Sequence, residues 1–312
     1  MPIIVGGRIS GGRIFSLSGG ASSPIVGFQG SVSGYTSGGF TTPSVNTIDK
    51  FPFATNANAT NVGVLTQARY SLAGQSSSVS GYSSGGQAPT RNTIDKFPFA
   101  SDANATNVGV LTQARHSLAG QSSSVSGYSS GGSPPTSNTI DKFPFASDAN
   151  ATTNVGVLTQ ARFSPAGQSS TVSGYTSGGS PNSVNVNCID KFPFASDANA
   201  TNVGVLTQAR RESAGQSSTV SGYTSGGFCL SSVNTIDKFS FASDANATNV
   251  GVLTQARRAS AGQSSTVSGY TSGGACLTTV NCIDKFPFAS NANATDVGDL
   301  TQARCFSAGQ QI

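Results

Sequence analysis

Residues 34–39 read GYTSGG, and this hexapeptide decides the fold because five further copies follow, with Ser or Thr in the third position. The copies begin at residues 34, 81, 127, 174, 222 and 269, so the steps are 47, 46, 47, 48 and 47 residues. Two other phrases share this period: IDKF, which contains an Asp, and LTQAR, which ends in an Arg. A period of 20–50 residues is typical of solenoids, propellers and other repeat arrays.

The first half of each unit predicts two short β-strands. Residues 77–82 (SSVSGY) are small, favour an extended backbone and lead into Gly-Gly, which is a turn signal. Residues 46–53 (NTIDKFPF) place Ile48 on one face of a strand and Phe51 and Phe53 on the other, because side chains alternate along a strand.

The second half of each unit predicts two more strands, in residues 61–69 (NVGVLTQAR) and 71–75 (SLAGQ). The Asn-rich segment 54–60 (ATNANAT) suits a loop, because Asn tolerates the left-handed backbone conformation and caps turns. No segment has helical periodicity. Four short strands in about 47 residues, repeated six times, predict an all-β protein, a six-bladed β-propeller with one small sheet per blade.

The ends of the chain favour a closed ring over an open solenoid, whose terminal units would differ in order to cap the stack. Residues 22–30 (SSPIVGFQG) align with the short strand of the other units, so one more copy of this strand is present than six blades need. We therefore expect N- and C-terminal strands to pair in one shared blade, which removes free sheet edges. Which end completes that blade stays open. The predicted organisation is an N-terminal arm, 1–21, followed by the propeller, 22–312.

Composition argues against several classes of function. Only 10% of the residues are charged and the net charge is +4, with no basic stripe of the kind that nucleic acid requires. Residues 1–28 contain no continuous apolar core of a signal peptide, and no membrane span is predicted. Five cysteines, an odd number at scattered positions, argue against a disulfide framework. These features favour a reducing compartment, or a virion assembled in the host cytoplasm.

The order of the phrases resembles the kelch motif. A double glycine follows a strand, as at Gly85 and Gly86, an Asp and an aromatic residue follow, as at Asp95 and Phe97, and an Arg such as Arg69 stands near the end of the repeat. The resemblance covers about residues 22–310. The Trp that is usual in this family is absent, and a valine takes its place in each unit: Val62, Val108, Val155, Val203, Val250 and Val297. The resemblance implies a divergent kelch-like propeller.

A second resemblance concerns the near-identical units themselves. Residues 95–115 (DKFPFASDANATNVGVLTQAR) are similar to repeats in proteins of tailed bacteriophages, especially those that infect marine cyanobacteria. This resemblance implies a component of a phage particle.

The repeated acidic and basic residues are the most prominent polar set. We interpret them as structural ion pairs or backbone-bonding groups that lock the blades, because buried charges need such partners and a catalytic site is not usually built six times. A ring of carboxylates that binds cations is the alternative. The Asp residues are Asp49, Asp95, Asp141, Asp190, Asp237 and Asp284, and the Arg residues are Arg69, Arg115, Arg162, Arg210, Arg257 and Arg304.

Nothing in the sequence predicts catalysis. The single histidine, His116, lacks an identifiable partner for general-base chemistry, and one His with dispersed Cys does not make a transition-metal site. Cys276 and Cys282 either face each other across a loop or are free small hydrophobic residues. The Gly-Gly pairs open no helix of the kind that cradles phosphate. We expect no enzyme activity, no cofactor and no metal.

The six units differ from one another at two places, after the repeated Arg and between Gly-Gly and Ile-Asp. Loops on a rigid scaffold are where binding usually resides, so a ring of variable residues is a candidate contact surface; drift at tolerant positions is the alternative. The ring consists of Tyr70, His116, Phe163, Arg211, Arg258 and Cys305.

These observations predict a structural or binding propeller, with a phage tail, fibre or capsid-associated part as the leading hypothesis. Its partners would be other virion or scaffold proteins, with residues 1–21 as a docking arm, or a glycan or receptor on the host surface. A lectin-like propeller and a cytosolic kelch-type adaptor are the alternatives. No nucleic acid partner and no membrane insertion are expected.

Overall fold

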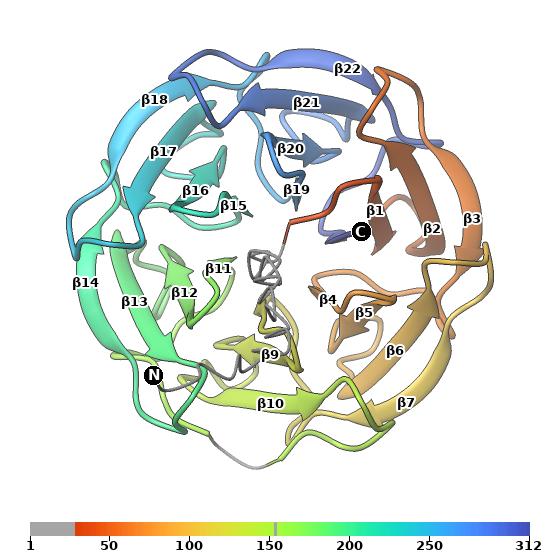
Figure 1. Ribbon diagram of the computed structural model, residues 1–312, viewed down its shortest axis with the longest axis horizontal. Helices are drawn as coiled ribbons and strands as arrows, with labels where there is room; N and C mark the ends of the chain where they lie inside the picture. The colour runs from red at the N-terminus through yellow and green to blue at the C-terminus, as the bar shows by residue number, and fades with distance from the viewer. Residues whose placement is uncertain (1–28, 153–154) are drawn as a thin grey trace, which may run out of the picture.

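The computed structural model describes residues 29–152 and 155–312, and every regular element in these ranges is a β-strand. The strands form six antiparallel sheets arranged as blades around a central axis (Figure 1). Five sheets have four strands, and in the third blade isolated bridges such as Lys142 to Thr152 stand in place of a fourth. The predicted six-bladed β-propeller is confirmed.

The two inner layers are rich in Ala, Gly and Ser, with Gln in each innermost strand and one Tyr in each second strand. The innermost strands are β4 (Ala73–Ser76), β8 (Ala119–Ser122), β11 (Ala166–Ser169), β15 (Ala214–Ser217), β19 (Ala261–Ser264) and β23 (Ala308–Gln311). The second layer contains β1 (Ser33–Gly39), β5 (Ser80–Ser84), β9 (Ser126–Ser130), β12 (Ser173–Ser177), β16 (Ser221–Ser225) and β20 (Ser268–Ser272).

The two outer layers contain the aromatic and valine-rich segments. The third strands are β2 (Val45–Pro52), β6 (Thr93–Pro98), β10 (Ile140–Pro144), β13 (Cys188–Pro193), β17 (Thr235–Ser240) and β21 (Cys282–Pro287). The outermost strands are β3 (Thr60–Val64), β7 (Thr106–Val110), β14 (Thr201–Val205), β18 (Thr248–Val252) and β22 (Thr295–Asp299).

One strand prediction was wrong in its extent. In residues 61–69 the strand ends at Val64, and the LTQAR phrase leaves the sheet and carries the chain to the next blade. The physical reason is that Leu65 and Arg69 turn into the space between blades, where both are buried. The following strand, β4, is therefore the innermost strand of the next blade and not the fourth strand of the same one.

The ring is closed by pairing the two ends of the chain, as expected. The C-terminal strand β23 lies against β1, with Gly34 opposite Gln311 and Ser37 opposite Ala308. The C-terminal end thus supplies the innermost strand of the shared blade. Of the segment 22–30, residues 22–28 lie outside the described residues, and the backbone N–H of Gly30 donates to the carbonyl of Ser264, 2.8 Å away.

The core lies between neighbouring blades. Ile48 and Phe51 are both buried on β2, but Ile48 packs with Phe97 and Phe99 of the following blade. Phe51 packs against the preceding blade, near Tyr270, as the predicted alternation requires. Burial of one such side chain stabilises the fold by about 1.5–3 kcal/mol. Each blade therefore depends on both neighbours for its apolar contacts.

Glycine residues allow the six innermost strands to pack closely around the central axis. Each innermost strand carries one Gly, and a Cβ atom added at Gly120 would overlap the carbonyl oxygen of Gly74 in the neighbouring blade. The same relation runs around the ring, so the six strands approach more closely than any side chain permits. They line a central channel, which contains a cavity of about 120 Å³ on the axis. The equivalent residues are Gly74, Gly120, Gly167, Gly215, Gly262 and Gly309.

Candidate functional site

The two ends of the channel belong to two different faces. One face carries the turns between innermost and second strands, such as 77–79, and the loops between third and outermost strands, such as 99–105. We call it the uniform face because the six units barely differ there. The other carries the loops after Gly-Gly, such as 87–92, and the residues after the repeated Arg, such as 70–72. We call it the variable face.

The repeated Asp and Arg side chains meet between blades and not at a surface. Each Arg belongs to the segment that leaves one blade, and its guanidinium pairs with the Asp of the next blade. All twelve side chains have an exposed fraction of 0%. The nitrogen–oxygen distances lie between 2.8 and 3.3 Å in the pairs Arg69–Asp95, Arg115–Asp141, Arg162–Asp190, Arg210–Asp237, Arg257–Asp284 and Arg304–Asp49.

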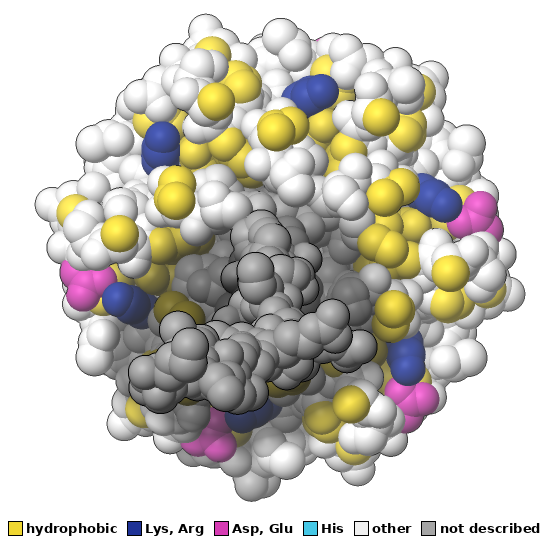
Figure 2. Space-filling model, viewed as in Figure 1, with side chains coloured by type: hydrophobic (Ala, Val, Ile, Leu, Met, Phe, Trp, Pro, Cys, Tyr) yellow, Lys and Arg dark blue, Asp and Glu magenta, His cyan; other side chains and the backbone are white. Residues whose placement is uncertain are grey.

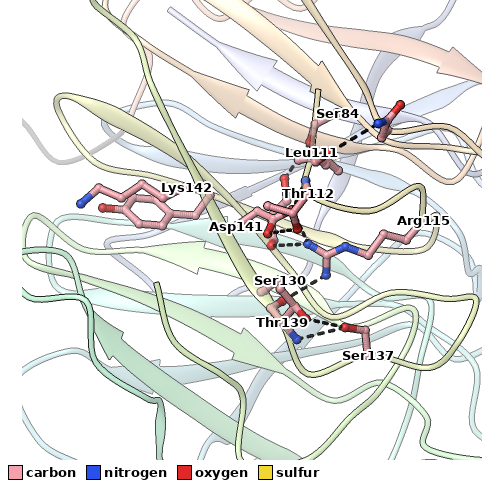
Figure 3. A network of polar contacts seen from close by, with 12 residues as sticks. Ser84, Leu111, Thr112, Arg115, Ser130, Ser137, Thr139, Asp141 and Lys142 are labelled. Carbon is pink, nitrogen blue, oxygen red and sulfur yellow. Dashed lines mark hydrogen bonds and ion pairs between the residues drawn. The ribbon is translucent and has the colours of Figure 1, made fainter. Parts of the chain in front are cut away.

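The carboxylates in this network are fully buried, and both oxygens of each are already bonded to neighbouring groups, as Asp141 illustrates. In Figure 3, Arg115 and Thr112 both point at Asp141, while Lys142 points the other way. The Thr112 hydroxyl donates to one carboxylate oxygen over 2.7 Å, and its backbone N–H donates to the other over 3.1 Å. Arg115 also donates to the carbonyl of Thr139 over 3.1 Å. The set joins consecutive blades.

Burial acts on the charge of these arginines. It lowers the pKa of Arg69, Arg210 and Arg304, and the partner carboxylate works in the opposite direction. An ion pair of this kind is costly to break, because a lone charge would remain in an apolar environment. The Asp–Arg network is accordingly a structural element, and a binding site must be sought elsewhere.

The uniform face repeats the same side chains around the ring. Four lysines pair with an Asp of the next unit over 2.9 to 3.1 Å: Lys50–Asp102, Lys96–Asp148, Lys142–Asp197 and Lys191–Asp244. In the units facing Lys238 and Lys285, Asn291 and Asn56 stand at the position of this Asp. Figure 2 shows this face, with basic side chains spaced around the ring, some beside an acidic one and others alone.

Valines also surround the uniform face. One valine precedes each second strand, and its exposed fraction ranges from 57% at Val32 to 66% at Val125. Such singly placed apolar residues are normal on a protein surface. The positions are Val32, Val79, Val125, Val172, Val220 and Val267.

The structure brings the predicted variable residues to equivalent places on the variable face. Each forms a two-residue antiparallel bridge with the residue that follows Gly-Gly in the same blade, such as Tyr70 with Gln87. Five of the six are half-buried, whereas Cys305 is buried with an exposed fraction of 4%. The bridge uses backbone groups only, so it forms whichever side chain is present. The other bridges are His116–Ser133, Phe163–Ser180, Arg211–Phe228, Arg258–Ala275 and Cys305–Phe40.

The turn that precedes these bridges explains the Gly-Gly pair. Gly85 and Gly86 have φ values of +66° and +111°, which glycine adopts without steric cost and other residues rarely reach. The pair thus reverses the chain and delivers Gln87 opposite Tyr70. The repeated phrase therefore positions the variable ring without taking part in it.

A ring of hydrogen bonds surrounds the mouth of the channel on this face. The residue after each variable position has a positive φ between 52° and 59°, and its N–H donates to the carbonyl of its counterpart in the preceding blade. The bond from Ser117 to Ser71 measures 2.7 Å. The six residues are Ser71, Ser117, Ser164, Glu212, Ala259 and Phe306, and they line a cavity of about 70 Å³.

The variable face has two chemically different sectors. At the boundary of the first and second blades, the rings of Phe40 and Phe306 lie 5.1 and 6.1 Å from that of Tyr70. Across the fifth and sixth blades, the guanidinium groups of Arg211 and Arg258 lie 4.8 and 4.5 Å from the ring of Phe228.

Sequence reasoning missed the residues that complete these sectors, among them Phe40, Phe228 and Asn185. They lie in the variable stretches, but the sequence does not show that the residue after Gly-Gly faces the residue after the repeated Arg. Their position could have indicated the pairing, because the residue after Gly-Gly and the residue after the repeated Arg each directly follow an invariant residue.

The remaining reactive side chains show no catalytic arrangement among the described residues. The Nδ1 atom of His116 lies 3.0 Å from the Ser117 hydroxyl, and burial lowers the pKa of this histidine. Cys276 and Cys282 are both free thiols, the first exposed and the second buried. Within the ranges 29–152 and 155–312, no three His, Cys, Asp or Glu side chains are grouped so that they could hold a metal ion.

The comparisons with known proteins add no assignment. No protein-family model matches the chain, and no curated protein matches it. Over the part of the chain that the structure describes, no helix is long and apolar enough to cross a membrane.

Proposed function

We propose that this protein is a non-enzymatic binding scaffold, a divergent kelch-like propeller that contacts its partner through the variable face. One observation carries the proposal: differences between the units begin directly after the buried Arg and directly after Gly-Gly, and both places open onto the same face. The backbone bridge between these two places recurs in all six units, so side chains there can change without disturbing the blades. This is the arrangement expected of a recognition surface on a rigid support.

The resemblance of the units to bacteriophage repeats supports a place on a virus particle, where the partner would be another virion protein or the host surface. Residues 1–21, the predicted docking arm, lie outside the described residues. Deletion of 1–21 is expected to abolish incorporation into particles and leave the melting temperature of the propeller unchanged. Incorporation at the original level would contradict the arm hypothesis.

The variable face is tested by comparing two triple variants of the full chain. One variant carries Tyr70→Ser, Phe163→Ser and Arg211→Ser on the variable face. The control carries Val79→Ser and Val125→Ser, with Val172→Ser, on the uniform face. Both remove exposed or half-buried side chains, and thermal unfolding checks that both variants fold.

Binding of the labelled variants to purified particles and to whole host cells gives the readout. We expect at least a tenfold loss for the variable-face variant, about 1.4 kcal/mol, and little change for the control. Equal binding by both variants, or a loss confined to the uniform-face control, would overturn the proposal.

A further inference from the structure

The most strongly charged part of the variable face is a cluster of four side chains from the fifth and sixth blades. Arg211 and Arg258 both lie against Phe228, close enough for cation–π interaction. Glu212 lies 3.2 Å from the Nε of Arg211 and 3.5 Å from the Nε of Arg258. One carboxylate thus serves two guanidinium groups, which leaves the cluster with one positive charge.

The hydrogen-bonding capacity of the cluster is only partly used. Arg211 donates from Nε to Glu212 and from one terminal nitrogen to the Asn185 side-chain oxygen, 3.0 Å away. Both terminal nitrogens of Arg258 lack a partner among the described residues, and 34% of its side chain is exposed. The guanidinium fork of Arg258 is therefore open to a ligand.

The cluster is held in place before any ligand arrives. Glu212 is largely buried, with a side-chain exposure of 11%, and its backbone N–H donates to Ser164 in the ring at the channel mouth. The ring of Phe228 contacts both guanidinium groups. A preorganised fork loses less entropy on binding a planar oxyanion than a free side chain does.

We propose that this cluster binds the carboxylate of an acidic sugar, with Arg258 as the bidentate partner and Arg211 as the second donor. The proposal rests on the proposed function, because it names the ligand class that the variable face would recognise. Fork-to-fork contact between guanidinium and carboxylate gives both geometry and energy. No other boundary between blades carries two cations at the variable positions.

The surroundings favour a sugar over a peptide. The adjoining cavity is lined by serine residues, among them Ser213, Ser260 and Ser307. Their hydroxyls each donate to a glycine carbonyl, which leaves the oxygen atoms as acceptors for the hydroxyl groups of a carbohydrate. A peptide that adds to a sheet needs free backbone groups on an edge. Here the backbone of Arg211 is already paired with that of Phe228 in both directions, by hydrogen bonds of 3.1 and 2.8 Å.

The test uses the full chain and a galacturonic acid trisaccharide, with neutral galactotriose as the matched probe, in titration calorimetry. We expect binding of the acidic trisaccharide only, weakened at least tenfold by Arg258→Gln and abolished by Arg211→Gln together with Arg258→Gln. Phe228→Ala should weaken binding less than the double change, because both charges remain. Raised salt should weaken binding as well.

The charge-matched control is Lys285→Gln on the uniform face, where Asn56 stands in place of the Asp that pairs with four of the other lysines. It removes the same charge and should leave the affinity within twofold. Equal weakening by Lys285→Gln, equal binding of galactotriose, or equal binding of an Asp-rich heptapeptide would overturn the proposal.

The two proposals fail separately. If the acidic trisaccharide does not bind while the variable-face triple variant still loses host-cell or particle binding, the sugar site is wrong and the scaffold function stands. If neither the trisaccharide nor cells and particles depend on the variable face, both are wrong.

Discussion

Two rings of residues in this propeller are adjacent in sequence but differ in burial and in how much they vary between units. Arg115 is identical in all six units and has an exposed fraction of 0%, whereas the next residue, His116, differs in almost every unit and is half-buried. The arginine is fixed because its side chain joins two blades through Asp141. The histidine position can vary because its backbone forms the bridge to Ser133, while its side chain contacts the adjacent Ser117 and, among the described residues, joins no second blade through an ion pair. Variation therefore starts directly after the Asp–Arg contact that all six blade boundaries share.

Among the changes predicted below, Asp141→Asn should lower the free energy of unfolding most, because it removes one of the ion pairs formed by the arginine ring. Arg115 would remain buried without its counter-charge, which typically costs about 3–5 kcal/mol. Denaturant unfolding of this variant, of Arg115→Met and of the double variant would measure the coupling. The double variant should cost less than the sum of the two single changes.

The control for these single and double variants is the adjacent residue in sequence, Lys142. Lys142 pairs with Asp197 at the surface, with 29% and 56% of the two side chains exposed. Lys142→Met should change the unfolding free energy by about 0–1 kcal/mol. A cost at Lys142 as large as that at Asp141 would contradict the distinction between buried and exposed pairs.

Gly120→Ala should have the next largest effect, because it pushes the innermost strands apart at the axis. The new methyl group would meet the backbone of Gly74, which cannot move aside as a flexible side chain would. We expect a loss of about 3 kcal/mol, at the upper end for overpacking. Denaturant unfolding measures the loss, and Ser78→Ala in an exposed turn is the control.

His116→Gln should change the free energy of unfolding least. Its pH dependence tests whether the variable ring contributes to stability differently from the arginine ring. Burial lowers the pKa of His116 in the folded protein, so the neutral ring is favoured and the unfolded chain binds the proton more readily. The stability that this residue contributes is complete above its unfolded pKa of about 6.5 and is lost as the pH falls towards the folded pKa.

Unfolding free energies of the two proteins between neutral and mildly acidic pH provide the measurement. We expect a difference within about 0.5 kcal/mol at neutral pH, as for other surface positions, and a relative gain for the glutamine variant in acid. A relative gain for the wild-type chain in acid would contradict the assignment.

The periodic part of this fold was predictable, and the parts that depend on three-dimensional neighbours were not. Glycine pairs, alternating Ile48 and Phe51, and the step of about 47 residues specify blades directly. The LTQAR phrase was assigned to a strand because Leu65 continues the apolar pattern, yet that side chain is buried between blades. The sequence of a repeat does not show which four consecutive strands form one blade, because the period is the same from any starting point.

The candidate site was predictable only as a set of positions. Arg211 and Arg258 could be named because units differ there, but Phe228, 17 residues after Arg211, joins them only through the bridge that the Gly-Gly turn creates. Glu212 shares its carboxylate between both arginines, and that geometry depends on its left-handed backbone. Contacts of this kind arise from the ring and not from any one unit.

The hydrogen bonds at the channel mouth have an electrostatic consequence. Each N–H donates to the preceding blade, from Ser117 to Ser71 and onward until Ser71 donates to Phe306, so the bonds run head to tail around the axis. The bond dipoles in such a closed cycle point along the circumference, and around a full turn their vector sum cancels. A helix terminus concentrates backbone charge at one point, whereas this circle presents none. An ion approaching the mouth therefore meets no net in-plane dipole from this circle, and the charged side chains beside it are Arg211, Arg258 and Glu212.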